Sequence, residues 1–199
     1  MTEAVNPLSD IQNEFKAFRE ECQWCKVVFN MHHDLFESGE KNSALLRKSA
    51  VWFFDDISGI LQEYHIMVVG RLTDPKETSG KKNLTVEHLV SELRRLNLCS
   101  TEIEDCAENV QNYRKLINKS RNKLVAHRDR DTILENIRGD GHLLEDVNKF
   151  HSDLNLLCDL IANAIEIDPM DFSATPAKGD AIDLIRLLRK FEKIQEIVG

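Results

Sequence analysis

Apolar residues recur at intervals of three and four along most of the chain, which is the periodicity of helices with one buried face. The pattern predicts a first helix from Ser9 to about Glu37, ended by Gly39, and a second from Ser43 to about Arg71. The second contains AVWFFDDISGILQEYHIMVV, which is apolar on most sides. We therefore expect it to be a central, buried helix.

A polar loop and two helices follow. The segment RLTDPKETSGKKN breaks the periodicity and carries a proline and a glycine, so we expect a loop there. Thr85 begins a short helix that ends at about Leu96. Thr101, with an acid at capping-box spacing, begins a long helix that runs to about His127. Its apolar stripe consists of Ile103, Cys106, Val110, Tyr113, Ile117 and Leu124.

The last third of the chain contains two more helices joined by a linker. We expect one helix at about 142–166 and an amphipathic one at 181–198, with a proline-containing linker at 168–180. No repeat and no convincing strand is found. The predicted fold is all-α: an antiparallel up-and-down bundle of four to five main helices plus a C-terminal helix. The expected domains are a bundle at 1–167, the linker, and a C-terminal helix at 181–199.

Cysteine usage and hydropathy narrow the class of protein. No apolar run approaches the roughly 18 residues of a membrane span, so we expect a cytoplasmic protein with no membrane contact. Five cysteines, an odd number, favour reduced thiols, and Cys99, Cys106 and Cys158 are expected to fill the core. Cys22 and Cys25 form a C-x-x-C, but no second pair follows at zinc-finger spacing. The sequence therefore predicts no metal site.

The sequence lacks the signature motifs of several common kinds of catalytic site. The chain has no P-loop, no H-E-x-x-H, no G-x-S-x-G and no G-x-G-x-x-G. His32 and His33 are adjacent on a helix and cannot face one ion together, so we expect surface histidines. Asp55 and Asp56 lie within the apolar second helix, where an unpaired buried carboxylate is costly, so we expect one of them to pair with a cation of the long helix. The other interpretation is a pair of catalytic carboxylates.

Positive charge is concentrated at the end of the long helix. The chain has a formal charge of −8, yet residues 111–130 contain seven Lys or Arg and one Asp. An acidic protein with one basic helix suits a local phosphate contact better than a long electrostatic track. The other interpretation is a solvated helix end, where cations offset the helix dipole.

Arg121 and His127 are the candidate catalytic residues. Arg121 continues the apolar stripe four residues after Ile117, so its guanidinium needs a carboxylate, a phosphate or an interface, unless it extends past the core edge. On an unbroken helix the two residues are separated by roughly 120° and about 9 Å. They converge only if the helix loosens near His127 or if two copies meet about a two-fold axis.

A histidine that titrates near neutral pH and a fixed guanidinium are the minimal set of catalytic groups for metal-free cleavage of RNA by a ribose 2′-hydroxyl. The imidazole of His127 would move protons, and Arg121 would stabilise charge on the phosphorane. Asp129 lies beside the histidine in sequence and would set the orientation of its ring. The side chains expected to contact RNA are Lys119, Lys123, Arg128 and Arg130.

The segment RNKLVAHRD resembles the motif of the HEPN superfamily, in which an Arg and a polar residue precede a His by a short interval. Here these residues are Arg121, Asn122 and His127. RNKLVAHRD and RLTDPKETSGKKNLTVEHL together resemble two shared segments of the abortive-infection AbiU branch. The resemblance covers roughly residues 45–165.

The resemblance implies a helical bundle that forms a homodimer, with the motif helices meeting across the interface. It implies a metal-independent endoribonuclease without a cofactor, acting in phage defence or a toxin–antitoxin system, with an antitoxin or other protein as a partner. Arg121 and His127 would be catalytic and Asn122 supporting. Two alternatives stay open: a non-catalytic module that binds a nucleotide, RNA or a protein through the same groove, and a buried polar network at the dimer seam.

Overall fold

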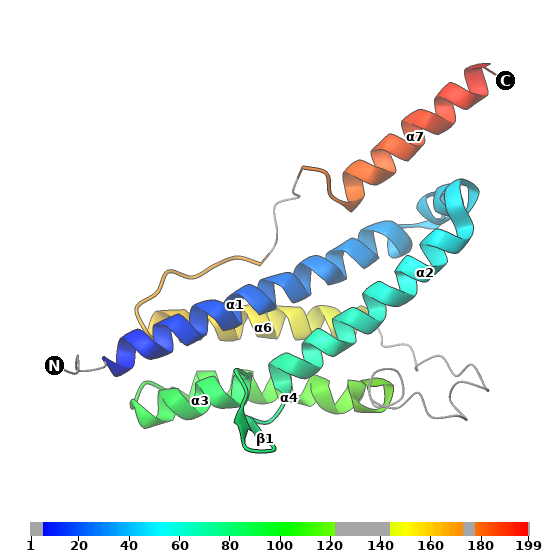
Figure 1. Ribbon diagram of the computed structural model, residues 1–199. Coiled ribbons are helices and arrows are strands. Elements are labelled where there is room, and N and C mark those ends of the chain that lie inside the picture. Colours follow the sequence, from blue (N-terminus) through cyan, green and yellow to red (C-terminus); the bar gives the residue numbers. More distant parts are fainter. Residues whose placement is uncertain (1–5, 122–143, 173–177, 199) are drawn as a thin grey trace. The chain divides into compact units, whose positions relative to one another are not determined.

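The computed structural model describes residues 6–121, 144–172 and 178–198, and their regular secondary structure is helical apart from one pair of two-residue strands (Figure 1). The prediction of an all-α protein is confirmed. The elements are α1 (Pro7–His32), the π-helix η1 (His33–Glu37), α2 (Glu40–Thr73), β1 (Glu77–Thr78), β2 (Lys81–Lys82), α3 (Val86–Arg95), α4 (Thr101–Arg121), α6 (Leu144–Ala164) and α7 (Ala181–Val198). Among the described residues, no helix is long and apolar enough to cross a membrane.

The loop predicted at 71–83 contains a small hairpin, so the prediction of no strand was wrong there. Glu77 pairs with Lys82 and Thr78 with Lys81. Ser79 and Gly80 between them both have positive φ, of 52° and 76°. Two consecutive residues at positive φ form the two-residue turn that best matches the twist of a hairpin, and glycine adopts that conformation without strain.

Contacts between residues divide the chain into two compact units. Unit 1 comprises residues 1–24 and 66–172, and unit 2 comprises residues 25–65 and 173–199. The helices α1 and α2 each contribute to both units. Each unit is described below by itself.

The core of unit 1 is formed by the apolar faces of α1, α3, α4 and α6. The ring of Tyr113 on α4 stacks on Phe150 on α6 with centroids 4.6 Å apart. On the α1 side, Gln12 donates a hydrogen bond to the carbonyl of Ile165, and Arg19 donates to the carbonyl of Asp168, both at 2.8 Å. The largest fully buried side chains of this unit are Phe15, Phe18, Leu89, Leu93, Ile103, Ile117, Phe150, Leu154, Leu157, Ile161 and Ile165.

The first residues of the predicted linker are fastened to α6. The Oδ1 of Asn155 accepts a hydrogen bond from the backbone N–H of Phe172 at 2.8 Å, and Asp159 accepts one from the N–H of Met170 at 3.3 Å. The side chain of Phe172 is buried. Residues 168–172 are therefore part of unit 1.

Unit 2 is a helical hairpin on which α7 packs. Gly39, with φ of 115°, lies between η1 and α2, as predicted from its place at the end of the first helix. The small core consists of Leu35, Leu45, Leu46, Phe54, Ala181 and Ile185. Two polar contacts fix α7 further: Arg189 donates to Asn42 at 2.6 Å, and Lys48 pairs with Glu192 at 2.9 Å.

Candidate functional site

Helix α4 carries the first residues of the predicted site. Its stripe is buried as predicted for Ile103, Cys106, Val110, Tyr113 and Ile117. The backbone remains helical to Arg121, where the described part of this helix ends. The register that brings Arg121 four residues after buried Ile117 is therefore that of a regular α-helix.

The helix start differs by one residue from the prediction. The Oγ of Ser100 accepts a hydrogen bond from the N–H of Ile103 at 3.3 Å. The cap is therefore Ser100, and Thr101 is the first residue of α4. The predicted start of α3 is confirmed, because Thr85 caps this helix and accepts from the N–H of His88 at 3.3 Å.

One cation of the basic segment, Arg114, binds other parts of the folded chain. Arg114 donates to the carbonyl of Thr73 and forms an ion pair with Asp74 at 2.8 Å. Both charged side chains are largely shielded from solvent, at 18% and 25% exposure. Lys115 donates to Asn112 on its own helix at 2.7 Å. The charge of Arg114 thus ties α4 to the end of α2, and it contributes less to the field outside than the sequence count suggests.

The remaining predicted site residues lie at or beyond the end of the described helix. Lys119 and Arg121 belong to the backbone of α4, and their side chains lie outside the described part of the chain. The other predicted site residues also lie outside the described residues: Asn122, Lys123, His127, Arg128, Asp129 and Arg130. The convergence of Arg121 and His127 stays a prediction.

Two predictions about polar side chains were wrong. Asp55 and Asp56 are exposed, with no ion pair to another described residue, because the face of α2 that carries them points away from the core of unit 2. His32 is buried where a surface position was expected. Its Nε2 lies 3.1 Å from Ser58 Oγ and 2.9 Å from Gln62 Nε2. Burial lowers the pKa of His32, and the neighbouring Glu37 opposes that shift.

The cysteines are mostly core residues. Cys106 and Cys158 are buried as predicted, whereas Cys99 precedes α4 and is half-buried, so its assignment to the core was wrong. Cys106 donates to the carbonyl of Asp153 at 3.1 Å. Burial raises the pKa of Cys106 to about 11, which keeps the thiol protonated and unreactive at neutral pH.

Unit 1 has a hollow between α3 and α4 of about 450 Å³. Four carboxylates line it, from Glu87, Glu104, Asp105 and Glu108, and its one cation, Arg94, is paired with Glu104 at 2.6 Å. An acidic lining repels phosphate, so this hollow does not suit a nucleic-acid backbone.

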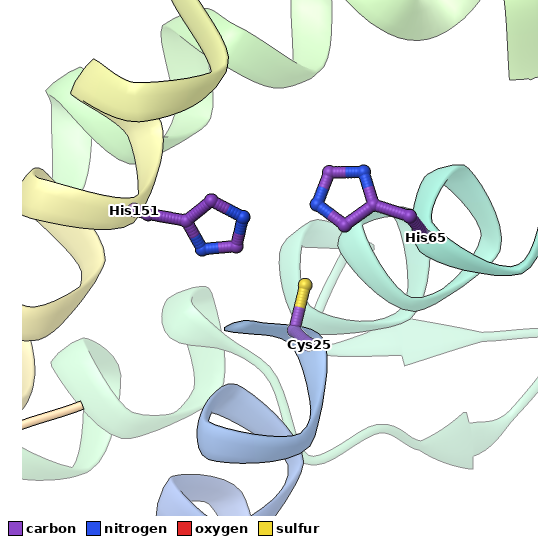
Figure 2. Close-up of side chains that lie close together, drawn as sticks. All are labelled: Cys25, His65 and His151. Atoms are coloured by element: carbon purple, nitrogen blue, oxygen red, sulfur yellow. The ribbon is translucent and has the colours of Figure 1, made fainter. Parts of the chain in front are cut away.

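Within unit 2, Cys25 on α1 and His65 on α2 are brought together, and sequence reasoning missed this pair. Both are buried, and Figure 2 shows the thiol and the imidazole directed toward one another; their ligand atoms lie within 4.8 Å. The residues are far apart in sequence, and only the pairing of two helices could have revealed the contact. Two ligands are fewer than the four of a structural zinc site, so this pair alone makes no metal centre.

His151, also labelled in Figure 2, belongs to α6 of unit 1. It is buried, and its ring meets that of Phe150 edge-on with centroids 5.2 Å apart. A buried histidine packed against an aromatic ring is a component of the core of that unit.

Comparison with known proteins gives one match. The sequence model HEPN_AbiU2, described as AbiU2, matches residues 8–184. The matched range runs from the second residue of α1 through α6 to the start of α7, and it contains the whole of RNKLVAHRD. No curated protein and no solved structure matches the chain.

Proposed function

Because the chain belongs to the AbiU2 family of HEPN proteins, with an all-α HEPN-like bundle, we propose that it is a cytoplasmic, metal-independent endoribonuclease of a phage-defence or toxin–antitoxin system. The observation that carries the proposal is the match over residues 8–184, which contains the Arg, polar residue and His of RNKLVAHRD in one segment. The match extends far beyond the short motif on both sides, and this supports reading RNKLVAHRD as the family motif.

The reaction assigns a role to each motif residue. A neutral His127 accepts the proton of a ribose 2′-hydroxyl, and the 2′-oxygen attacks the adjacent phosphorus. The bond from phosphorus to the 5′-oxygen then breaks, and a protonated imidazole donates a proton to that leaving oxygen. Arg121 stabilises the added negative charge of the phosphorane, and Asn122 supports its position. The products end in a 2′,3′-cyclic phosphate and a 5′-hydroxyl.

Two histidines in opposite protonation states suit this reaction, and each chain has one such histidine in the motif. We therefore propose a homodimer whose motif helices meet, so that one His127 acts as base and the other as acid. A second copy is needed in this proposal because one straight helix would hold Arg121 and His127 roughly 120° apart.

Electrostatics favours a short RNA contact. The formal charge is −8, and Arg114 is already paired with Asp74. The other cations of residues 111–130 are Lys115, Lys119, Arg121, Lys123, Arg128 and Arg130. Few phosphate contacts imply modest affinity and a shallow dependence on salt, which fits a target recognised over a few nucleotides.

The test is cleavage of total RNA and of purified tRNA in EDTA. Wild-type protein is expected to cleave, and His127→Ala and Arg121→Ala are expected to lose about 10²–10⁴-fold in rate, the usual contribution of a general acid–base or charge-stabilising group. His33→Ala and Arg47→Ala are matched controls, because each removes the same type of side chain from an exposed or half-exposed position in unit 2.

Circular dichroism of each variant shows whether the fold is retained. The proposal fails if folded wild-type protein leaves RNA intact, or if His127→Ala cleaves as fast as His33→Ala. Saturable RNA binding that Arg121→Ala abolishes, without any cleavage, would identify a non-catalytic binding module in place of the enzyme.

A further inference from the structure

Three side chains of unit 2 form a series of contacts from a carboxylate through an imidazole to a hydroxyl. His32 ends α1, Glu37 ends η1, and Ser58 lies on α2, all within residues 25–65. The Nδ1 of His32 lies 3.4 Å from Oε1 of Glu37, and its Nε2 lies 3.1 Å from Oγ of Ser58. A carboxylate, a histidine and a serine in this order are the groups that activate a serine for attack on a carbonyl carbon.

The π-helix η1 places Glu37 beside His32. Glu37 follows His32 by five residues, and on an α-helix two such residues point roughly 140° apart. A π-helix bonds residue i to residue i+5, so these two positions lie one turn apart on nearly the same side. Single turns of this kind are rare and are found frequently at functional sites. A local departure from the α-helix therefore brings the carboxylate to the imidazole.

The contacts of His32 assign its tautomer and its protonation state. Glu37 accepts, so Nδ1 carries the proton and Nε2 is left to accept from the hydroxyl of Ser58. Among the described residues, the titratable groups that act on His32 are Glu37 and His33. Ser58 and Gln62, which face it from α2, are uncharged. Burial lowers the pKa of His32, so the imidazole is mostly neutral at pH 7 and able to take a proton.

The surface beside Ser58 is open to a small molecule. Ser58 is half-buried, and its neighbour Gly59 is exposed, with nothing within 4 Å of the place where a Cβ would lie. Gln62, one turn further along α2, is exposed, and its Nε2 lies 2.9 Å from Nε2 of His32. This amide contacts the same imidazole nitrogen as the hydroxyl, so it can donate to an oxyanion that forms there. The backbone N–H groups of a helix interior are already bonded within the helix.

From this geometry we propose that Ser58 is a nucleophile that accepts an acyl group from an activated ester, with His32 as its base and Glu37 as the residue that positions the imidazole. The Oγ of Ser58 attacks the carbonyl carbon while its proton passes to Nε2 of His32. The bond from that carbon to the leaving oxygen breaks, and the leaving oxygen takes the proton from the imidazole. The products are an acyl-serine and an alcohol or phenol. The reaction uses no residue of RNKLVAHRD.

Acetylation of the full chain by p-nitrophenyl acetate tests the proposal. A burst of about one p-nitrophenolate per chain is expected, because this anion leaves more readily than the alkoxide of Ser58 and the acetyl-serine therefore accumulates. Peptide mass spectrometry should place the acetyl group on Ser58. Ser49, on the same helix, is the internal control, because it is exposed but its hydroxyl donates to the carbonyl of Leu45 at 2.8 Å in place of an imidazole.

Substitutions separate the base from the positioning residue. His32→Gln should slow the acetylation of Ser58 at least about 100-fold, the lower end of what a general base contributes. Glu37→Gln should slow it less, because the side chain of Glu37 is 39% exposed and its charge is partly screened. It should also move the midpoint of the rate–pH profile to lower pH, since the carboxylate raises the pKa of His32. Glu40→Gln, exposed in the same unit, is the matched control and should leave that midpoint in place.

The proposal is overturned if Ser58 of the wild-type protein acquires no more acetyl label than Ser49. It is also overturned if His32→Gln, shown by circular dichroism to be folded, is acetylated at Ser58 as fast as the wild type. Ser58→Ala should leave RNA cleavage unchanged, and His127→Ala should leave the burst unchanged. The acylation of Ser58 and the proposed cleavage of RNA therefore fail separately.

Discussion

At the scale of single residues, local hydrogen bonds determine where helices begin. The hydroxyl of Ser100 accepts from an N–H of the first turn of α4, and Thr85 does the same for α3. Sequence spacing identified Thr85 but selected Thr101 in place of its neighbour, because a Ser-Thr pair offers two hydroxyls and the pattern cannot distinguish them.

Substituting the two hydroxyls separately tests the assignment of the cap. Ser100→Ala should lower the free energy of unfolding by about 1 kcal/mol, since an N–H of α4 loses its acceptor. Thr101→Ala, within the helix, should change it by no more than about 0.5 kcal/mol. Urea unfolding followed by circular dichroism measures both. A larger loss of unfolding free energy for Thr101→Ala than for Ser100→Ala would identify Thr101 as the cap.

His32 should make stability depend on pH. Burial lowers its pKa from the ordinary value of 6.5, so the folded state binds a proton less readily than the unfolded chain. The stability that neutral His32 contributes to the folded state is therefore present above pH 6.5. It is lost as the pH falls through that value toward the pKa of the folded state. His32→Gln keeps polar atoms near Ser58 and should flatten the decline in melting temperature below about pH 6.5. Equal declines in both proteins would contradict this account.

At the scale of elements, periodicity and caps located α3, α4 and α6 closely, because those signals are local. The prediction that α2 is buried on most sides was wrong, because Trp52, Phe53 and Ile60 are apolar but exposed. Composition alone does not show which apolar side chains of a helix face the core. The hairpin at 77–82 was missed because its strands are short and charged. In the candidate site, the spacing of Arg121 and His127 was visible in the sequence, whereas the pairing of Arg114 with Asp74 required tertiary structure.

The amide of Asn155 makes two of the hydrogen bonds that attach residues 168–172 to α6. Asn155 accepts from the N–H of Phe172 and donates to Asp159 and to the carbonyl of Met170. Asn155→Ala removes these bonds at a cost of about 1–3 kcal/mol and should speed chymotrypsin cleavage after Phe172 at least about fivefold. Leu156→Ala, at the exposed neighbouring position, is the control. Equal rates of cleavage for the two variants would show that the bonds do not hold this segment.

At the scale of the whole molecule, the chain is an acidic HEPN-family protein with one basic segment, and its proposed activity depends on two copies. In that proposal each copy would supply half of the site, because Arg121 and His127 would be poorly placed to act together on one straight helix.

The most direct test of the central claim is the chemistry of the RNA ends produced in EDTA. Wild-type protein should leave 2′,3′-cyclic phosphates, and a substrate that lacks the 2′-hydroxyl at the cleaved position should remain intact, because the 2′-oxygen is the nucleophile. Cleavage that persists on the 2′-deoxy substrate, or that His127→Ala leaves unchanged, would contradict the account.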